Sequence, residues 1–207
     1  MKLRYNAPVT LTFSLMCAAV LLLGQLTPKQ DGVSTLIITY FSISPLGFSF
    51  SNPLSWMRLL THVMGHANWT HLIANFSFIL LIGPILEEKY GSGPILFMMV
   101  VTALATGLLD VFLIKADLLG ASGIVFTLIL LSSFTNIRSG EIPITFLLIV
   151  ALYLVKEFLD ALTPSPIANV AHIAGGAIGA AFGFLFARKP QKELPAAEEK
   201  NALGTKP

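Results

Sequence analysis

Six long apolar segments dominate this chain and restrict the folds open to it. They cover roughly residues 8–26, 70–88, 93–114, 119–136, 143–162 and 167–187. A helix needs about 20 mostly apolar residues to cross a bilayer, and it satisfies its own backbone hydrogen bonds there. The pattern predicts an all-α membrane protein with six transmembrane helices, of which the fourth is short.

The composition supports this class and excludes others. Hydrophobic residues make up 55% of the chain and charged residues 12%, whereas soluble domains contain about 25% charged residues. The net charge of +2 is too small to indicate nucleic acid as a partner. Cys17 is the single cysteine, so neither an intrachain disulfide nor a cysteine metal cluster can form. The expected surroundings are a lipid bilayer.

The apolar segments divide the chain into four parts. Residues 1–27 hold the N-terminus and a first span that imitates a signal peptide, but no small-x-small cleavage site follows it. Residues 28–69 mix polar, aromatic, glycine and proline residues, which predicts an outer loop lying in the membrane interface. Residues 70–187 contain spans two to six and form the membrane core. The polar tail, 188–207, is predicted to be disordered.

The basic residues orient the spans, because cytoplasmic loops carry an excess of lysine and arginine. With both termini inside, the cytoplasmic side holds Lys2, Arg4, Lys89, Arg138, Arg188, Lys189, Lys192, Lys200 and Lys206. The outer side then holds Lys29, Arg58 and Lys115. We therefore predict cytoplasmic termini, and the short chain with a basic start suggests a bacterial inner membrane.

Three spans carry polar groups that a membrane helix accommodates at a cost. His71 and Asn75 are four residues apart and so share one face of span two. Ser122 opens span four between small residues, and His172 lies about one turn into span six. Because spans two, four and six all run inward from the outside, these groups are expected at the same, outer side of the membrane.

Glycines in span six offer a way to bring two of these groups together. Gly175 and Gly179 have the small-xxx-small spacing that lets helices approach closely, so His172 could reach Ser122. Serine needs an adjacent base to act as a nucleophile. The oxyanion that follows attack on a peptide carbonyl needs fixed donors, which the Ser122 amide, His71 and Asn75 could supply. This pattern predicts acyl-enzyme chemistry.

The order and spacing of these motifs resemble the rhomboid family of intramembrane serine proteases, over about residues 57–187. The residues that carry the resemblance are His62-x3-His66-x4-His71-x3-Asn75, EEKYGSG at 87–93, Gly120-x-Ser122-Gly123 and Ala171-His172-x2-Gly175-x3-Gly179.

The resemblance implies roles for these residues. Ser122 would be the nucleophile and His172 its general base, in a dyad without an aspartate. His71, Asn75 and the Ser122 amide would form the oxyanion hole. Gly120 and Gly123 would shape the entry to span four, and Glu87 would match a structural acid at the inner end of span two.

Two positions depart from the family pattern. Phe126 stands where the family often has a tyrosine that stacks on the catalytic histidine. Stacking should survive this change, while a hydrogen bond from the hydroxyl would be lost. Met57-Arg58 replaces a Trp-Arg pair in the first loop, with Trp56 displaced by one position.

Charged residues in span five are a further feature. Lys156 and Asp160 are four residues apart and could pair, whereas Glu157 has no obvious partner. The family resemblance suggests a lateral substrate gate beside this span. His62 and His66 precede span two and are interpreted as structural.

The sequence thus predicts a serine endopeptidase, without metal or cofactor, that cuts a substrate's transmembrane segment in or near its outer end. One alternative is an inactive relative of the same fold that binds transmembrane helices, although both dyad residues are present. A second is a small transporter, for which we find no inverted repeat.

Overall fold

The computed structural model describes residues 5–44, 47–114 and 117–137, with 144, 147, 148, 151, 152, 155, 175, 177–179, 181 and 182. The elements in chain order are α1 (Pro8–Gly24), β1 (Lys29–Gln30), β2 (Val33–Ser34), α2 (Thr35–Tyr40), α3 (Pro53–Thr61), η2 (His62–Met64), α4 (Trp69–Tyr90), α5 (Ser92–Leu109), η3 (Asp110–Ile114) and α6 (Ser122–Ile137). The described part of the chain is thus predominantly helical, with one small antiparallel hairpin formed by β1 and β2.

The long helices coincide with the first four apolar segments of the sequence. Trp69–Tyr90 and Ser92–Leu113 are each long and apolar enough to cross a membrane. The apolar helices Pro8–Gly24 and Ser122–Ser132 are shorter. The fifth and sixth predicted spans, 143–162 and 167–187, lie largely outside the described residues, as do Lys156, Glu157 and Asp160.

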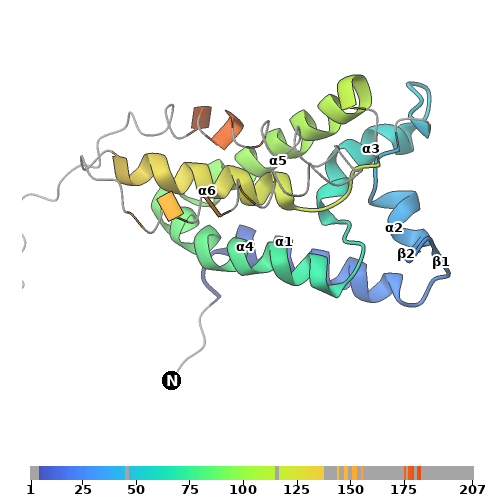
Figure 1. The fold of residues 1–207 in the computed structure, drawn as a ribbon, viewed down its shortest axis with the longest axis horizontal. Helices are drawn as coiled ribbons and strands as arrows, with labels where there is room; N and C mark the ends of the chain where they lie inside the picture. Colours follow the sequence, from blue (N-terminus) through green and yellow to red (C-terminus); the bar gives the residue numbers. More distant parts are fainter. Residues whose placement is uncertain are drawn as a thin grey trace, which may run out of the picture.

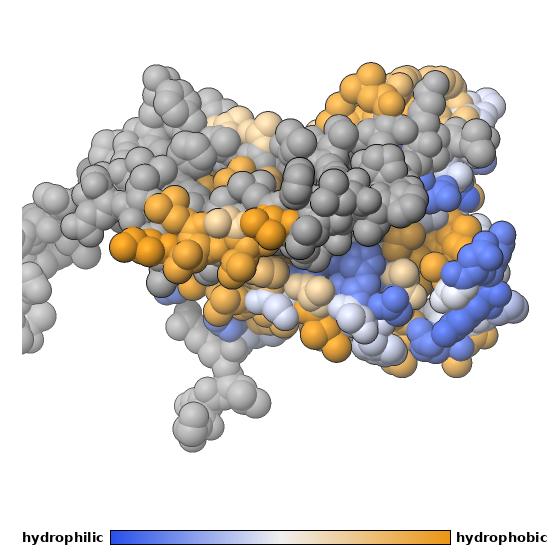
Figure 2. Space-filling model, in the orientation of Figure 1, coloured by the Kyte–Doolittle hydropathy of each residue, from blue (hydrophilic) through white to orange (hydrophobic). Residues whose placement is uncertain are grey.

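The long helices lie side by side, and the short elements gather at one end of them (Figure 1). Helix α4 packs against both α1 and α6. Hydrophilic residues are concentrated toward the end that carries the hairpin, while apolar residues cover much of the visible helix surface (Figure 2). Side chains of α4, α5 and α6, including Ile79, Met98 and Ile124, form the main buried core.

The N-terminus of α1 is capped by a side chain from the far end of α4. Ala7, which precedes the helix, offers no capping side chain. Instead, Glu87 Oε1 accepts from the Val9 amide at 2.9 Å, and Oε2 accepts from the Thr10 amide at 2.9 Å and its hydroxyl at 2.8 Å. The carboxylate therefore satisfies amides that a helix start leaves unpaired and interacts favourably with the positive end of the helix dipole.

We expect Glu87→Gln to destabilise the protein. The amide keeps one acceptor and turns a donor toward backbone N–H groups or the Thr10 hydroxyl, so buried donors lose their partner. The free energy of unfolding should fall by about 2–3 kcal/mol. Thermal unfolding in detergent micelles measures this, with Glu88→Gln as the matched control because Glu88 is the exposed neighbour. Equal unfolding temperatures for the two variants would contradict the capping role.

Buried His62 ties the loop between α1 and α4 to α5. Its Nδ1 lies 3.1 Å from the Arg58 carbonyl oxygen, and its Nε2 lies 3.3 Å from Thr106 Oγ1. A carbonyl oxygen can only accept, so Nδ1 carries the proton. Burial lowers the pKa of His62 to about 4, which keeps the ring neutral at physiological pH.

This shift predicts a loss of stability in acid. An unfolded histidine binds a proton near pH 6.5, while folded His62 does so only near pH 4. Between these values the unfolded state binds more protons, so stability falls as the pH falls, by about 3 kcal/mol in total, and levels off below pH 4.

Thermal unfolding of the wild type and of His62→Gln between pH 7.5 and pH 4.5 measures this effect. The variant retains a side-chain donor and should show a shallower decline in unfolding temperature. Parallel declines in the two proteins would contradict the assignment to His62.

Candidate active site

The segment before α6 is irregular, and the loop between α1 and α4 holds it in place. Ile43 and Leu118 exchange two backbone hydrogen bonds of 2.9 Å, and the Gly120 amide donates to the His62 carbonyl at 2.9 Å. Gly120 has a φ of +117°, a conformation that glycine adopts readily. These bonds satisfy backbone groups that no helix pairs, and they fix where α6 begins.

The start of α4 lies directly against this segment. Asn68 caps α4, since its Oδ1 accepts from the His71 amide at 2.8 Å. A Cβ placed on Gly120 would lie 2.8 Å from both Nε2 and Cε1 of His71. The His71 ring therefore packs on Gly120, two residues before Ser122, and a larger residue at 120 would displace it.

Ser122 is the first residue of α6 and is partly exposed. Its position at a helix N-terminus places the positive end of the helix dipole beside it. Gly123, Ile124 and Val125, which follow it, are buried. A serine there combines access from outside with a rigid support beneath it.

Asn75 lies one turn below His71 on the same face of α4. It is 6% exposed, and its Nδ2 donates to the His71 carbonyl at 3.1 Å. This bond uses one of the two amide N–H groups and fixes the side chain's orientation. The predicted shared face of these two residues agrees with this geometry.

Residues 175 and 179 pack tightly on α6. A Cβ on Gly175 would lie 2.5 Å from the Gly123 carbonyl oxygen, and one on Gly179 would lie 2.5 Å from that of Thr127. The Thr127 hydroxyl also donates to the Gly175 carbonyl at 2.7 Å. The backbone at Gly175 and Gly179 is thus so close to α6 that a side chain larger than glycine's hydrogen would collide with it. His172 itself lies outside the described residues.

Phe126, one turn after Ser122, is 7% exposed and belongs to the main hydrophobic core. Its side chain therefore helps to fix the first turns of α6. The stacking on His172 that the sequence suggests stays a prediction.

His66 is closer to the site than its structural interpretation implied. Its ring is buried, and its centroid lies 5.0 Å from that of His71 in an edge-to-face arrangement. Nδ1 donates to the Met64 carbonyl at 3.1 Å. Burial, and second the nearby His71, lower the pKa of His66 to about 4. A neutral His66 thus supports the His71 ring, and the spacing His66-x4-His71 was the one sequence signal for this contact.

The described residues contain no group of three or more histidine, cysteine, aspartate or glutamate side chains that could hold a metal ion.

Comparison with known proteins connects this arrangement to a family. The rhomboid domain model matches residues 53–189. The rhomboid protease GlpG of Haemophilus influenzae is 23% identical over 195 residues, covering 93% of this chain and 97% of its own. Those of Yersinia pestis and Yersinia pseudotuberculosis are 27% identical over 181 residues, covering 86% of this chain. The chain spans 62% of the length of these Yersinia relatives.

The family model covers more than half of the chain, and it includes both the α4 and the α6 residues described above. The chain therefore belongs to the rhomboid family and is an integral membrane protein.

Proposed function

We propose that this protein is an intramembrane serine endopeptidase. The observation that carries the proposal is the packing of the His71 ring on Gly120, two residues before Ser122. The start of α4 thereby lies against the segment that leads into Ser122, although His71 and Ser122 are 51 positions apart in sequence. The relatives named rhomboid protease support the same activity.

In the proposed mechanism, Ser122 attacks the scissile carbonyl and His172 takes its proton. Gly175 lies against Gly123, and His172 precedes Gly175 by three residues. Three residues span at most about 11 Å, and this short connection is compatible with the proposed approach of His172 to Ser122. The histidine then returns the proton to the leaving amine, and water hydrolyses the acyl-enzyme.

The oxyanion would be bound by the Ser122 amide together with side-chain donors of His71 and Asn75. Asn75 has a second amide N–H besides the one bonded to the His71 carbonyl. Donors that are already held in place lose little freedom when the negative charge develops. His66 and Gly120 both pack against the His71 ring, and we assign them as positioning residues.

The proposed setting is a six-helix bundle in a bacterial inner membrane, with both termini cytoplasmic and Ser122 toward the outer side. Substrates would be transmembrane proteins cut in or near the outer end of a span. A helix shields its own peptide bonds by hydrogen bonding, so small or helix-destabilising residues such as glycine, alanine or proline should lie near the cut.

The dyad predicts that Ser122→Ala and His172→Ala each reduce cleavage by about 10⁴-fold or more. The assay is cleavage of a fluorescent peptide with one glycine-containing transmembrane segment, by purified protein in liposomes. Ser77→Ala is the control, because this exposed hydroxyl on α4 donates to the Ile73 carbonyl, away from the site.

Thermal unfolding establishes that the variants are folded. Equal cleavage by the wild type and both dyad variants would refute the dyad. A wild type that binds the peptide and does not cleave it would instead favour the inactive, helix-binding relative.

Gly120→Ala should lower the cleavage rate by about 100-fold, because a displacement of about 1 Å can cost this much. The added methyl group collides with the His71 ring and strains a positive φ. Gly93→Ala is the matched control, since a Cβ there meets nothing within 4 Å. Unchanged kcat in folded Gly120→Ala would contradict the role of the His71 position.

A further inference from the structure

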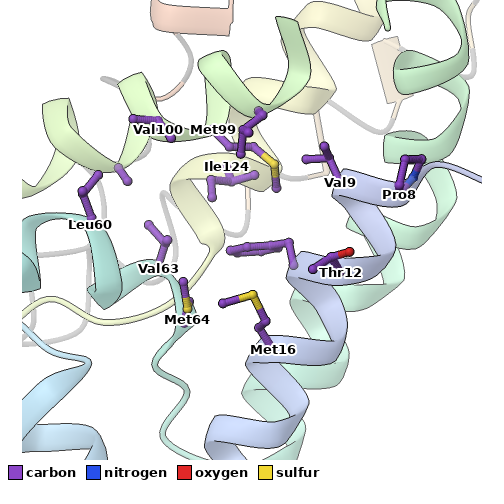
Figure 3. A pocket seen from close by; sticks show the side chains of 13 residues that line it. Pro8, Val9, Thr12, Met16, Leu60, Val63, Met64, Met99, Val100 and Ile124 are labelled. Atoms are coloured by element: carbon purple, nitrogen blue, oxygen red, sulfur yellow. The ribbon is translucent and has the colours of Figure 1, made fainter. Parts of the chain in front are cut away.

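An apolar pocket of about 440 Å³ lies between α1, α3, η2, α5 and the first turn of α6. Figure 3 shows Val9 and Met16 of α1, Val63 and Met64 of η2, and Met99 of α5 converging on it. Its size falls within the range of sites that bind small molecules, about 300–1,000 Å³. The pocket is separate from the groups placed around Ser122 in the site described above.

The lining excludes polar ligands. It consists of aliphatic, methionine and phenylalanine side chains, with one alanine, one proline and the hydroxyl of Thr12. That hydroxyl is already hydrogen-bonded to Tyr5 at 2.9 Å. A polar or charged group entering here would lose its hydration without gaining a partner. Methionines adapt their shape readily, which suits a flexible apolar occupant.

The mouth of the pocket is lined by exposed apolar side chains. Leu96 and Val100 of α5, Met16 of α1 and Leu60 of α3 line it, and each is between 38% and 52% exposed. Helix α5 is one of the helices long enough to span the membrane. Because the chain is an integral membrane protein, we expect this exposed apolar mouth to face lipid.

The deeper wall, by contrast, is buried. Ile124 is 0% exposed, Ala103 2% and Met99 5%. Water does not stably fill so apolar a cavity, and an empty one lacks packing contacts along its walls. The apolar molecule always present at this mouth is a lipid, at a concentration that favours occupation by mass action.

We propose that this pocket binds an acyl chain of a bilayer phospholipid. The chain would enter between α1 and α5 and reach Ile124, two residues after Ser122. It would also contact Val63, next to His62, whose carbonyl accepts from the Gly120 amide. The bound chain would thus pack beneath the segment that leads into Ser122. The inference rests on the membrane location and stands whether or not the protein cleaves peptides.

Photolabelling tests the proposal. The protein is reconstituted into vesicles of phosphatidylethanolamine and phosphatidylglycerol that contain a phosphatidylethanolamine with a diazirine within one acyl chain. After irradiation, peptide mass spectrometry maps the labelled residues. We expect label on buried Met99 and Ile124, well above that on Leu128, which is equally buried and does not line the pocket. Label confined to exposed residues such as Leu113 would overturn the proposal.

Val100→Trp should block the mouth and remove the label from Met99 and Ile124. Leu108→Trp is the matched control, because Leu108 lies on the same helix with 36% exposure against 38% for Val100, and does not line the pocket. Leu96→Trp, on the same helix one turn before Val100, is a second blocking variant should Val100→Trp not fold. Label that persists in a folded blocking variant would overturn the proposal.

A transmembrane peptide carrying the same diazirine provides the competing occupant. It should label exposed residues of the protein without labelling Ile124 or displacing the lipid label. If the peptide labels Ile124 and displaces the lipid, the pocket belongs to a protein segment and the assignment to an acyl chain is wrong.

Discussion

Backbone groups within a membrane protein must find partners in the protein itself, and the irregular segment before α6 depends on this constraint. The partners come from the loop between α1 and α4, through the paired bonds of Ile43 with Leu118 and the bond from Gly120 to His62. His62 is in turn fixed to Arg58 and Thr106 by its ring. The first loop is therefore a structural part of the candidate site. Its Ile43 and His62 carbonyls accept the hydrogen bonds of the Leu118 and Gly120 amides, which precede α6.

At the opposite end of the helices, a side chain satisfies the unpaired backbone amides. Glu87 near the end of α4 accepts from two amides at the start of α1, and Ser92 at the start of α5 donates to the same carboxylate at 2.7 Å. One buried group thus joins three helix ends. Helices α1 and α4 are held at this end by a charge-assisted cap and at the other by the loop that connects them.

Features that depend on neighbouring residues could be predicted from the sequence, whereas features that depend on contacts between distant residues could not. Hydropathy is local, so the starts and ends of the first four helices lie close to the predicted bounds, and the shared face of His71 and Asn75 follows from helical periodicity. The short helices α2 and α3 begin at the caps Ser34 and Asn52 and depend on tertiary contacts, so apolar patterning did not reveal them. The partners of Glu87 lie 77 and 78 residues away, a distance that no pattern encodes.

The first turn of α6 separates two environments. Successive residues of a helix are about 100° apart, so Ser122 and Ile124 point in nearly opposite directions. Ser122 is partly exposed, and the peptide hydrolysis proposed for it needs water. Ile124 is fully buried and lines the apolar pocket proposed to bind a lipid acyl chain. The proposed hydrolysis at Ser122 and the apolar pocket at Ile124 are therefore separated by the thickness of one helix, about 10 Å. The buried residues after Ser122 maintain this division.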